Sequence, residues 1–222
     1  MIFFIEDGVN LKETDPNYDI KQLAIECATK RMYPDIISVK RLRELTGGGI
    51  RTPMGCRSFL QTWKDENGEE VNAGRMNMGV VTLNLPRIAL RSKGNKEEFW
   101  KILSKKLEIS KDALVYRANR VIQAKPENAP ILYQNGGFGK RLKAGESVKD
   151  LFNNKRATIS LGYIGLYEVG TVFYGPNWES NPEAKEFTLD VLRELKRNTD
   201  NWGNEFGYHF SVYGTPSESL TD

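Results

Sequence analysis

The chain has 222 residues, of which 39% are hydrophobic and 27% are charged, and its formal net charge is +3. Such a chain is long enough to bury a sizeable core, and the mild charge without a dense basic block argues against direct binding of nucleic acid. No apolar run approaches the roughly 20 residues of a membrane span, and the apolar start before Glu6 is too short for a signal peptide.

Cysteine and histidine are too sparse to build a metal site. Cys27, Cys56 and His209 are the only residues of these types, and they form no CxxC or HExxH pattern. We therefore expect no metal in this chain and no disulfide framework. A reducing, cytoplasmic location fits this cysteine usage.

The first part of the chain predicts strand, helix and strand. Residues 2–5 form a short apolar run, and residues 35–39 are also β-prone. Between them, apolar residues recur at helical spacing over residues 20–32, with Asp19 as a possible N-cap. Cys27 falls on the apolar side of this helix, so we expect it to fill the core.

Residues 45–60, LTGGGIRTPMGCRSFL, carry Cys56 behind four glycines and a proline. Glycine permits unusual backbone angles, and Pro53 restricts both itself and Thr52, so residues 47–55 read as a shaped loop. A thiol on such a loop is either presented to a ligand or buried as an inert side chain, and the loop alone leaves both readings open.

The next segment predicts a hairpin turn, a strand and a helix start. Asn67-Gly68 is a turn signal, residues 80–85 resemble a buried strand, and Pro86 suits the first turn of a helix. Asn77 precedes the apolar strand. Its amide either meets backbone groups at the strand edge or holds a substrate hydroxyl.

The remaining segments alternate between helices and strands. Residues 96–124 predict a long helix with a break near residues 109–111, and residues 147–152 predict a short helix. Residues 156–170 read as a strand, a turn and a short helix, residues 181–201 as an amphipathic helix, and residues 206–213 as a strand. The glycine-rich residues 128–142 lack the pattern of a phosphate-binding P-loop.

The last residues have the composition of a helix start directly after a strand. Residues 214–219, GTPSES, offer hydroxyl caps, an early proline and an early Glu218. Free N–H groups at such a start suit a bound phosphate, although Glu218 would repel an anion unless it points away. Since the sequence stops there, we expect the chain to be a piece of a longer enzyme.

Several segments, in order, resemble the anaerobic, class III ribonucleotide reductases, which are glycyl radical enzymes. The resemblance covers most of the chain from about residue 20, and its segments are TPMGCRSFL around Cys56, GRMNMGVVTLNLPR from Gly74, KPENAPILYQNGG from Lys125, RATISLGYIGLYE from Arg156 and YGTPSESLTD from Tyr213.

This resemblance implies an α/β fold, specifically part of a ten-stranded α/β barrel with a finger loop at about residues 46–60. It implies that residues 1–222 form a single, incomplete catalytic-barrel segment. Cys56 would form the thiyl radical that removes the 3′ hydrogen of the ribose, and Asn77 would hydrogen-bond to the ribose or its departing hydroxyl. Ser58 is a weaker candidate for substrate contact.

The same resemblance implies a substrate-phosphate loop at residues 214–219. The substrate-binding candidates in it are Gly214, Thr215, Pro216, Ser217, Glu218 and Ser219. The implied substrate is a ribonucleoside triphosphate, and the implied product is a deoxyribonucleoside triphosphate.

Other parts of the family's pattern are missing from this sequence. They are the glycyl radical loop, the C-terminal zinc site, the N-terminal regulatory part and a second active-site cysteine. The resemblance therefore implies that the remaining parts of the reductase are partners, with an iron–sulfur, S-adenosylmethionine-dependent activase and a homodimeric assembly. We expect no turnover from this chain alone.

Two alternatives remain open. Another glycyl radical enzyme of the same barrel fold is disfavoured because such enzymes typically carry adjacent cysteines, whereas this loop reads Gly55-Cys56-Arg57. A non-catalytic remnant that binds nucleotides or pairs with a full-length subunit is disfavoured only mildly, by the joint presence of Cys56, Asn77 and residues 214–219.

Overall fold

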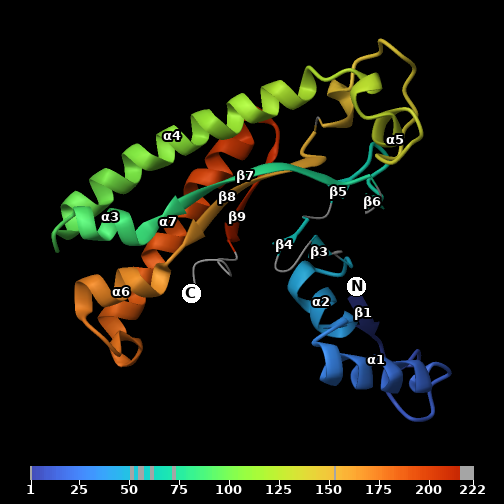
Figure 1. Ribbon diagram of the computed structural model, residues 1–222, viewed down its shortest axis with the longest axis horizontal. Helices are drawn as coiled ribbons and strands as arrows, with labels where there is room; N and C mark the ends of the chain where they lie inside the picture. The colour runs from blue at the N-terminus through green and yellow to red at the C-terminus, as the bar shows by residue number, and fades with distance from the viewer. Residues whose placement is uncertain are drawn as a thin grey trace. The chain divides into compact units, whose positions relative to one another are not determined.

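The computed structural model describes residues 2–50, 53–54, 58–60, 63–71, 74–152 and 154–215, with only the backbone at 53–54 and 58–59 (Figure 1). The chain divides into two compact units. The first contains Met1–Thr52 and Glu66–Glu70, and the second contains Pro53–Asp65 and Val71–Asp222.

The first unit is built on a pair of parallel strands. Strand β1 (Ile2–Ile5) pairs with β2 (Asp35–Ser38), and helix α1 (Tyr18–Arg31) connects them. Helix α2 (Val39–Thr46) follows, capped by the Ser38 side chain, which accepts a hydrogen bond from the Arg41 amide at 3.3 Å. Both predicted strands and the predicted helix are therefore present.

The prediction that Cys27 fills the core is wrong, because Cys27 is exposed. The side of α1 that turns inward is set by Lys21, which is buried and donates a hydrogen bond from Nζ to the Leu11 carbonyl. As a result, Leu23 remains 66% exposed. The helix begins after Asn17 and not after Asp19, and no side-chain cap is present there.

Four short strands follow. Strand β3 (Pro53–Met54) pairs antiparallel with β4 (Ser58–Phe59), so two parts of the predicted finger loop at about residues 46–60 run side by side. Strands β5 (Trp63–Lys64) and β6 (Glu70–Val71) flank the turn at residues 66–68, where the Asn67-Gly68 signal predicted one.

The second unit is organised around a parallel sheet in the order β7-β8-β9. Its strands are β7 (Met76–Asn84), β8 (Ala157–Ile164) and β9 (His209–Gly214). The helices of this unit are α3 (Leu85–Arg91), α4 (Lys96–Ile122), α5 (Pro130–Tyr133), α6 (Leu166–Tyr174) and α7 (Pro182–Phe206). Short 3₁₀ turns lie at Pro126–Asn128, Lys149–Leu151 and Trp178–Ser180.

Helix α4 is continuous, so the predicted break near residues 109–111 is wrong. Its buried stripe passes straight through Ser110, because the buried residues recur every three or four positions: Phe99, Leu103, Leu107, Ser110, Leu114 and Ala118. A buried serine that keeps the helical spacing does not interrupt the helix. The Asn95 side chain caps its start by accepting a hydrogen bond from the Glu98 amide at 3.0 Å.

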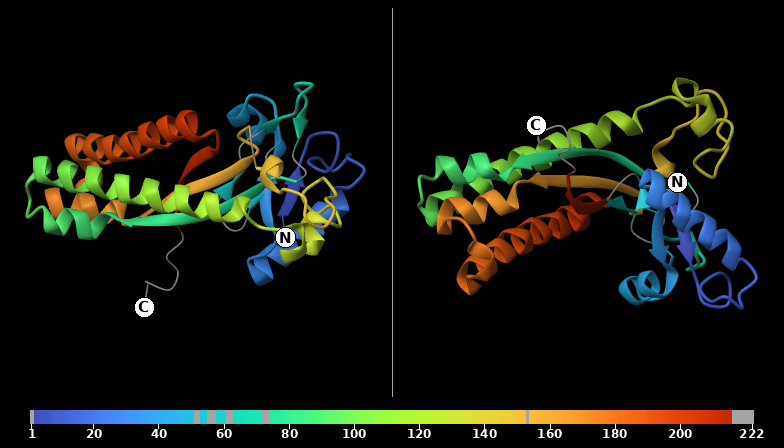
Figure 2. Two further views of the ribbon diagram at one scale, coloured as in Figure 1. Left: turned by 90° about the horizontal axis from the view of Figure 1, so that it is seen from above. Right: turned by 60° about the horizontal axis from the view of Figure 1, so that its bottom comes forward.

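The core of the second unit lies between the sheet and its long helices. Apolar residues from β8 and β9 cluster with residues from α4 and α7, and Figure 2 shows both helices running along the sheet. Phe99 lies among aromatic rings, with ring centroids 5.4 Å from Trp100 and 5.5 Å from Phe173. This packing fixes the sheet that carries the candidate site.

Candidate functional site

The two faces of the β7-β8-β9 sheet differ in chemistry. Because register neighbours point to the same side, the strands form rows across the sheet. One face carries apolar rows such as Val81–Leu161–Val212 and contributes to the core. The opposite side, here called the polar face, consists of Asn77, Val80, Thr82, Thr158, Ser160, Gly162, His209, Ser211 and Tyr213.

Asn77 lies within β7 and not before the strand, at a local irregularity. The register of β7 against β8 shifts between Asn77 and Val80. Gly79 has a φ of +132°, and a Cβ atom there would lie 2.5 Å from Nη1 of Arg117. The positive φ strains any other residue, and an added Cβ would also force the Arg117 side chain to move. Bulges of this kind often redirect a side chain near a functional site.

The Asn77 amide is held at both ends. Its Oδ1 accepts a hydrogen bond from the Gly79 amide at 2.7 Å, and its Nδ2 donates to Ser160 Oγ at 2.7 Å. Ser160 Oγ in turn lies 2.9 Å from Ser211 Oγ. A chain of three polar side chains therefore crosses all three strands of the sheet.

Thr215 follows directly after β9 and is fixed to the same sheet, at the opposite end of the strands from Asn77. Its amide donates to the Tyr163 carbonyl at 3.0 Å, and its hydroxyl lies 3.0 Å from the Thr82 hydroxyl. The two hydroxyls meet above Gly162, where an added Cβ would overlap Thr215 Oγ1 and lie 2.6 Å from Thr82 Oγ1. Because glycine has no side chain, position 162 leaves room for the contact between the two hydroxyls.

Two arginines directly precede strands β7 and β8, at the amino ends of the strands, away from Thr215. Arg75 Nε donates to the Arg156 carbonyl at 2.7 Å, and Arg156 donates to the Phe138 carbonyl. Burial, and then the nearby positive charge of Arg156, lower the pKa of Arg75 to about 10. Burial also lowers the pKa of Arg156. These side chains tie backbone segments together at the start of the sheet.

The predicted site residues fall partly inside the described structure. Asn77 and Thr215 both lie on the polar side of the sheet, and Gly214 ends β9. Cys56 and residues 216–219 lie outside the described residues, and Ser58 is described only as backbone in β4. Sequence reasoning missed Ser160, Ser211 and Thr82, although the alternation of hydroxyl and apolar residues along ATISL of β8 was a usable signal.

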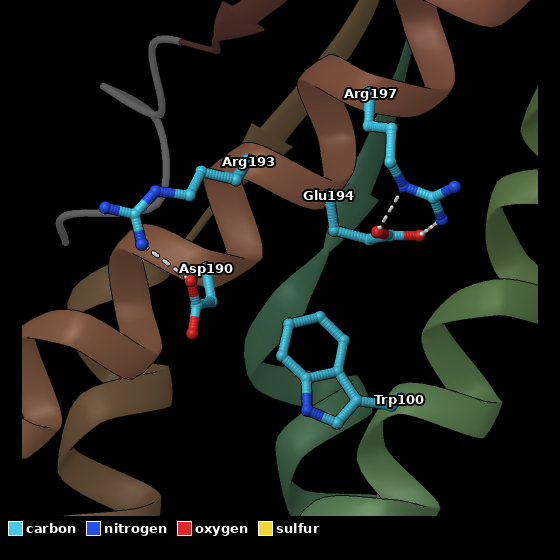
Figure 3. Close-up of a pocket in the computed structure, with 5 residues that line it drawn as sticks. All are labelled: Trp100, Asp190, Arg193, Glu194 and Arg197. Atoms are coloured by element: carbon cyan, nitrogen blue, oxygen red, sulfur yellow. Dashed lines mark hydrogen bonds and ion pairs between the residues drawn. The ribbon is translucent and has the colours of Figure 1, made fainter.

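The helix layer carries a surface pocket lined by Trp100 of α4 and four charged residues of α7 (Figure 3). Its arginines are already paired: Arg193 with Asp190 at 2.6 Å, and Arg197 with Glu194 at 2.6 Å. The pocket therefore offers an incoming anion little free positive charge, and the polar face remains the better candidate site.

Within the described ranges, no three His, Cys, Asp or Glu side chains gather as a metal ion would require. No helix in this part of the chain is both long and apolar enough to span a bilayer.

The geometry defines a class first: a mixed α/β protein with parallel sheets, in which a bulged strand presents an asparagine on a hydroxyl-rich face. The family follows from comparison. The model for the family "Anaerobic ribonucleoside-triphosphate reductase" matches residues 1–222, and the chain belongs to this family.

Curated relatives have the same description. The anaerobic ribonucleoside-triphosphate reductase of Escherichia coli K12 is 48% identical over 223 residues, which cover 100% of this chain and 31% of that protein. The reductase of Enterobacteria phage T4 is 44% identical over 225 residues, which cover 99% of this chain and 36% of that protein. The chain thus spans about a third of the length of these relatives.

Solved structures agree on the fold. The anaerobic ribonucleotide reductase of Thermotoga maritima with citrate in the active site matches with a TM-score of 0.60 at 18% identity, over 98% of this chain and 35% of that one. The same enzyme in complex with dATP and CTP matches with a TM-score of 0.55 at 18% identity, over 95% of this chain and 31% of that one.

Proposed function

We propose that this chain is a catalytic-core segment of an anaerobic ribonucleotide reductase, which converts ribonucleoside triphosphates to deoxyribonucleoside triphosphates. The observation that carries the proposal is the Asn77 amide, fixed on the polar face of a parallel sheet in a chain of this family. In this proposal β7, β8 and β9 are strands of a ten-stranded barrel, and the polar face lines its interior.

Asn77 has the hydrogen-bonding capacity that a ribose hydroxyl requires. Its contacts within the described structure use one N–H hydrogen and one oxygen lone pair. An amide has two of each, so a donor and an acceptor remain for a ligand. The same side chain can therefore accept from a ribose hydroxyl and donate to it as it departs.

Cys56 is the proposed radical residue, on the finger loop at about residues 46–60. Its thiyl sulfur takes the hydrogen atom from C3′ of the ribose, so that an S–H bond forms while a C–H bond breaks. Loss of the 2′ hydroxyl as water follows, and a two-electron reductant completes the reduction. Hydrogen-atom transfer needs close positioning and no general base, so the single histidine of this chain is no obstacle.

The segment from Gly214 to Ser219 is the proposed contact with the substrate triphosphate. Support comes from Thr215, whose amide and hydroxyl are both anchored to the sheet at the carboxyl end of the strands. Ligands of parallel α/β sheets commonly bind at this end. The anchored Thr215 fixes where residues 216–219 begin, and Ser58 remains a proposed secondary contact.

The remaining parts of the proposal concern partners. Relatives are about three times as long as the match, and in this proposal the segments that they carry outside it are needed for turnover. They would supply the glycyl radical and the structural zinc. An activase with an iron–sulfur cluster and S-adenosylmethionine, a homodimeric assembly and a reducing cytoplasm complete the proposed setting.

The test is turnover by the complete reductase, in which this sequence is joined to the segments that its relatives carry outside the match. Asn77→Ala should lower kcat by about 100-fold or more, because it removes a group positioned at the reacting centre. Binding of the ribonucleoside triphosphate should persist. Ser92→Ala is the matched control, since it removes a buried hydrogen bond to the Ala89 carbonyl, away from the polar face.

An unchanged kcat in Asn77→Ala would contradict the proposed role of Asn77. A complete reductase that binds nucleotides without reducing them, even after activation, would instead support a non-catalytic binding remnant.

A further inference from the structure

The hydrogen-bonding partners of the Asn77 side chain determine which way its amide is oriented. The Gly79 backbone amide is a donor only, so it must face the oxygen Oδ1 of Asn77. The nitrogen Nδ2 is thereby directed at Ser160 Oγ, which accepts its hydrogen bond at 2.7 Å. A flipped amide would place the donor Nδ2 against the donor N–H of Gly79, and the hydrogen bond from Gly79 would be lost.

Ser160 is well placed to act as a fixed acceptor. It is 1% exposed, in the middle of the central strand β8, where its neighbours in the row are Val80 and Ser211. Because its hydroxyl accepts from Asn77, its own hydrogen is available for Ser211 Oγ at 2.9 Å. Ser211 therefore restricts the rotation of the Ser160 hydroxyl, and Ser160 restricts the Asn77 amide.

We propose that Ser160 and Ser211 are positioning residues for Asn77 in ribonucleotide reduction. They need not touch the substrate. They hold the amide so that its remaining N–H and lone pair face the ribose. This inference rests on the proposed function, because it assigns the serines a purpose only if Asn77 acts on the substrate.

The competing explanation is an ordinary contact between neighbouring strands that stabilises the sheet and nothing else. The two explanations differ in what they expect of kcat. A stabilising contact changes the melting temperature alone, whereas a positioning contact changes turnover in an enzyme that is still folded.

The experiment measures kcat and KM in the complete, activated reductase for Ser160→Ala, Ser211→Ala and the double variant. Loss of Ser160 should lower kcat by roughly tenfold or more, because small displacements of a positioned group are costly. Loss of Ser211 should lower kcat by only a few-fold, on the order of one weakened hydrogen bond. KM should change little in each.

The double variant gives the sharper result. If Ser211 acts through Ser160, the double variant should match Ser160→Ala alone, because the effects of coupled residues do not add. If the fold losses in kcat of the two single variants multiply in the double variant, Ser211 does not act through Ser160. Ser92→Ala, which also loses a buried serine hydroxyl, should keep a normal kcat.

A second measurement separates this inference from the proposed function. In the ¹⁵N NMR spectrum of the chain, the Asn77 side-chain amide is assigned by its loss in Asn77→Ala. In Ser160→Ala its hydrogens should exchange faster with water and shift. An unchanged amide signal, or a normal kcat in Ser160→Ala beside an inactive Asn77→Ala, would overturn the positioning role and leave the proposed function standing. A fully active Asn77→Ala would overturn the positioning role together with the proposed role of Asn77, whereas a complete, activated reductase that forms no product would overturn the proposed function itself.

Discussion

Gly79 is the residue whose backbone produces the bulge that presents Asn77. Its φ of +132° strains any other residue, and a Cβ atom would also meet the Arg117 side chain. We expect Gly79→Ala to destabilise the chain by about 1–3 kcal/mol in denaturant unfolding. Gly94→Ala is the comparison variant, since its φ of +80° is also positive but nothing lies within 4 Å of its Cβ position. Equal losses in the two variants would contradict the combined strain of backbone and Arg117 contact at Gly79.

Gly162 permits the contact between Thr82 and Thr215 for a different reason. Its backbone is not strained, so Gly162→Ala tests space alone. We expect the added methyl group to displace Thr215 and to weaken binding of a ribonucleoside triphosphate by several-fold, measured by calorimetry on the complete reductase. Thr82→Val, which keeps the shape but removes the hydroxyl, should weaken binding less. Unchanged affinity in Gly162→Ala would argue against residues 214–219 as the phosphate loop.

At this scale the sequence pointed to some site residues and not to others. Asn77 and Thr215 stood out because they lie in segments that resemble a known family. Ser160 and Ser211 did not, because a serine in a strand has many ordinary explanations. Their pairing depends on the register between β8 and β9, which no local pattern specifies.

Among the elements, α4 packs a stripe of buried residues against strands β7 and β8. Phe99 is fully buried in an aromatic cluster, with its ring centroid 5.6 Å from that of Phe187 in α7. We expect Phe99→Ala to cost about 3–5 kcal/mol of unfolding free energy. Ile109→Ala, on the same helix but 59% exposed, should cost less than about 0.5 kcal/mol. Similar losses of unfolding free energy in the two variants would contradict the observation that Phe99 lies on the buried side of α4 and Ile109 on its exposed side.

A lysine–glutamate ion pair, to which a tyrosine is hydrogen-bonded, joins the starts of α4 and α7. Lys96 Nζ lies 2.8 Å from Glu183 Oε1 and donates to the Tyr174 hydroxyl at 2.7 Å. Hydrogen bonds from Lys96 and then Tyr174 lower the pKa of Glu183 below its ordinary value of 4.5. The hydrogen bonds to Glu183 and then Tyr174 raise the pKa of Lys96 above 10.5.

The pH dependence follows from these directions. The stabilisation from Glu183 is complete above pH 4.5 and is lost as the pH falls through its lowered folded value. The stabilisation from Lys96 is complete below pH 10.5 and is lost as the pH rises through its raised folded value. The difference in melting temperature between the wild type and Glu183→Gln should therefore be largest between these limits and shrink on both sides. A difference that stays constant down to pH 3 would contradict the pairing.

Elements were predicted well where a local pattern sufficed and poorly where burial depended on distant contacts. The strands β1, β2, β8 and β9 and the helix α7 lie where their apolar residues predicted them, and α3 begins at Leu85, beside the Pro86 that predicted a helix start. The break in α4 was wrongly predicted because a lone serine carries no information about what packs against it. The exposure of Cys27 was missed because the buried Lys21 decides which side of α1 faces inward.

For the whole molecule, the family was accessible from sequence because several separate segments match it in order. The matches to reductases along the entire chain support that assignment. The division into two units and the polar face were not accessible, because both depend on contacts between residues far apart in the chain.

Cys56 is the residue proposed to carry the radical chemistry of ribonucleotide reduction. Its role is tested by formation of deoxyribonucleotide in the complete, activated reductase with Cys56→Ala, compared with Cys27→Ala, which replaces the exposed cysteine of α1. We expect Cys56→Ala to form no product while it still binds the ribonucleoside triphosphate, and Cys27→Ala to behave as the wild type. Product formation by Cys56→Ala at the wild-type rate would show that Cys56 is not the radical residue.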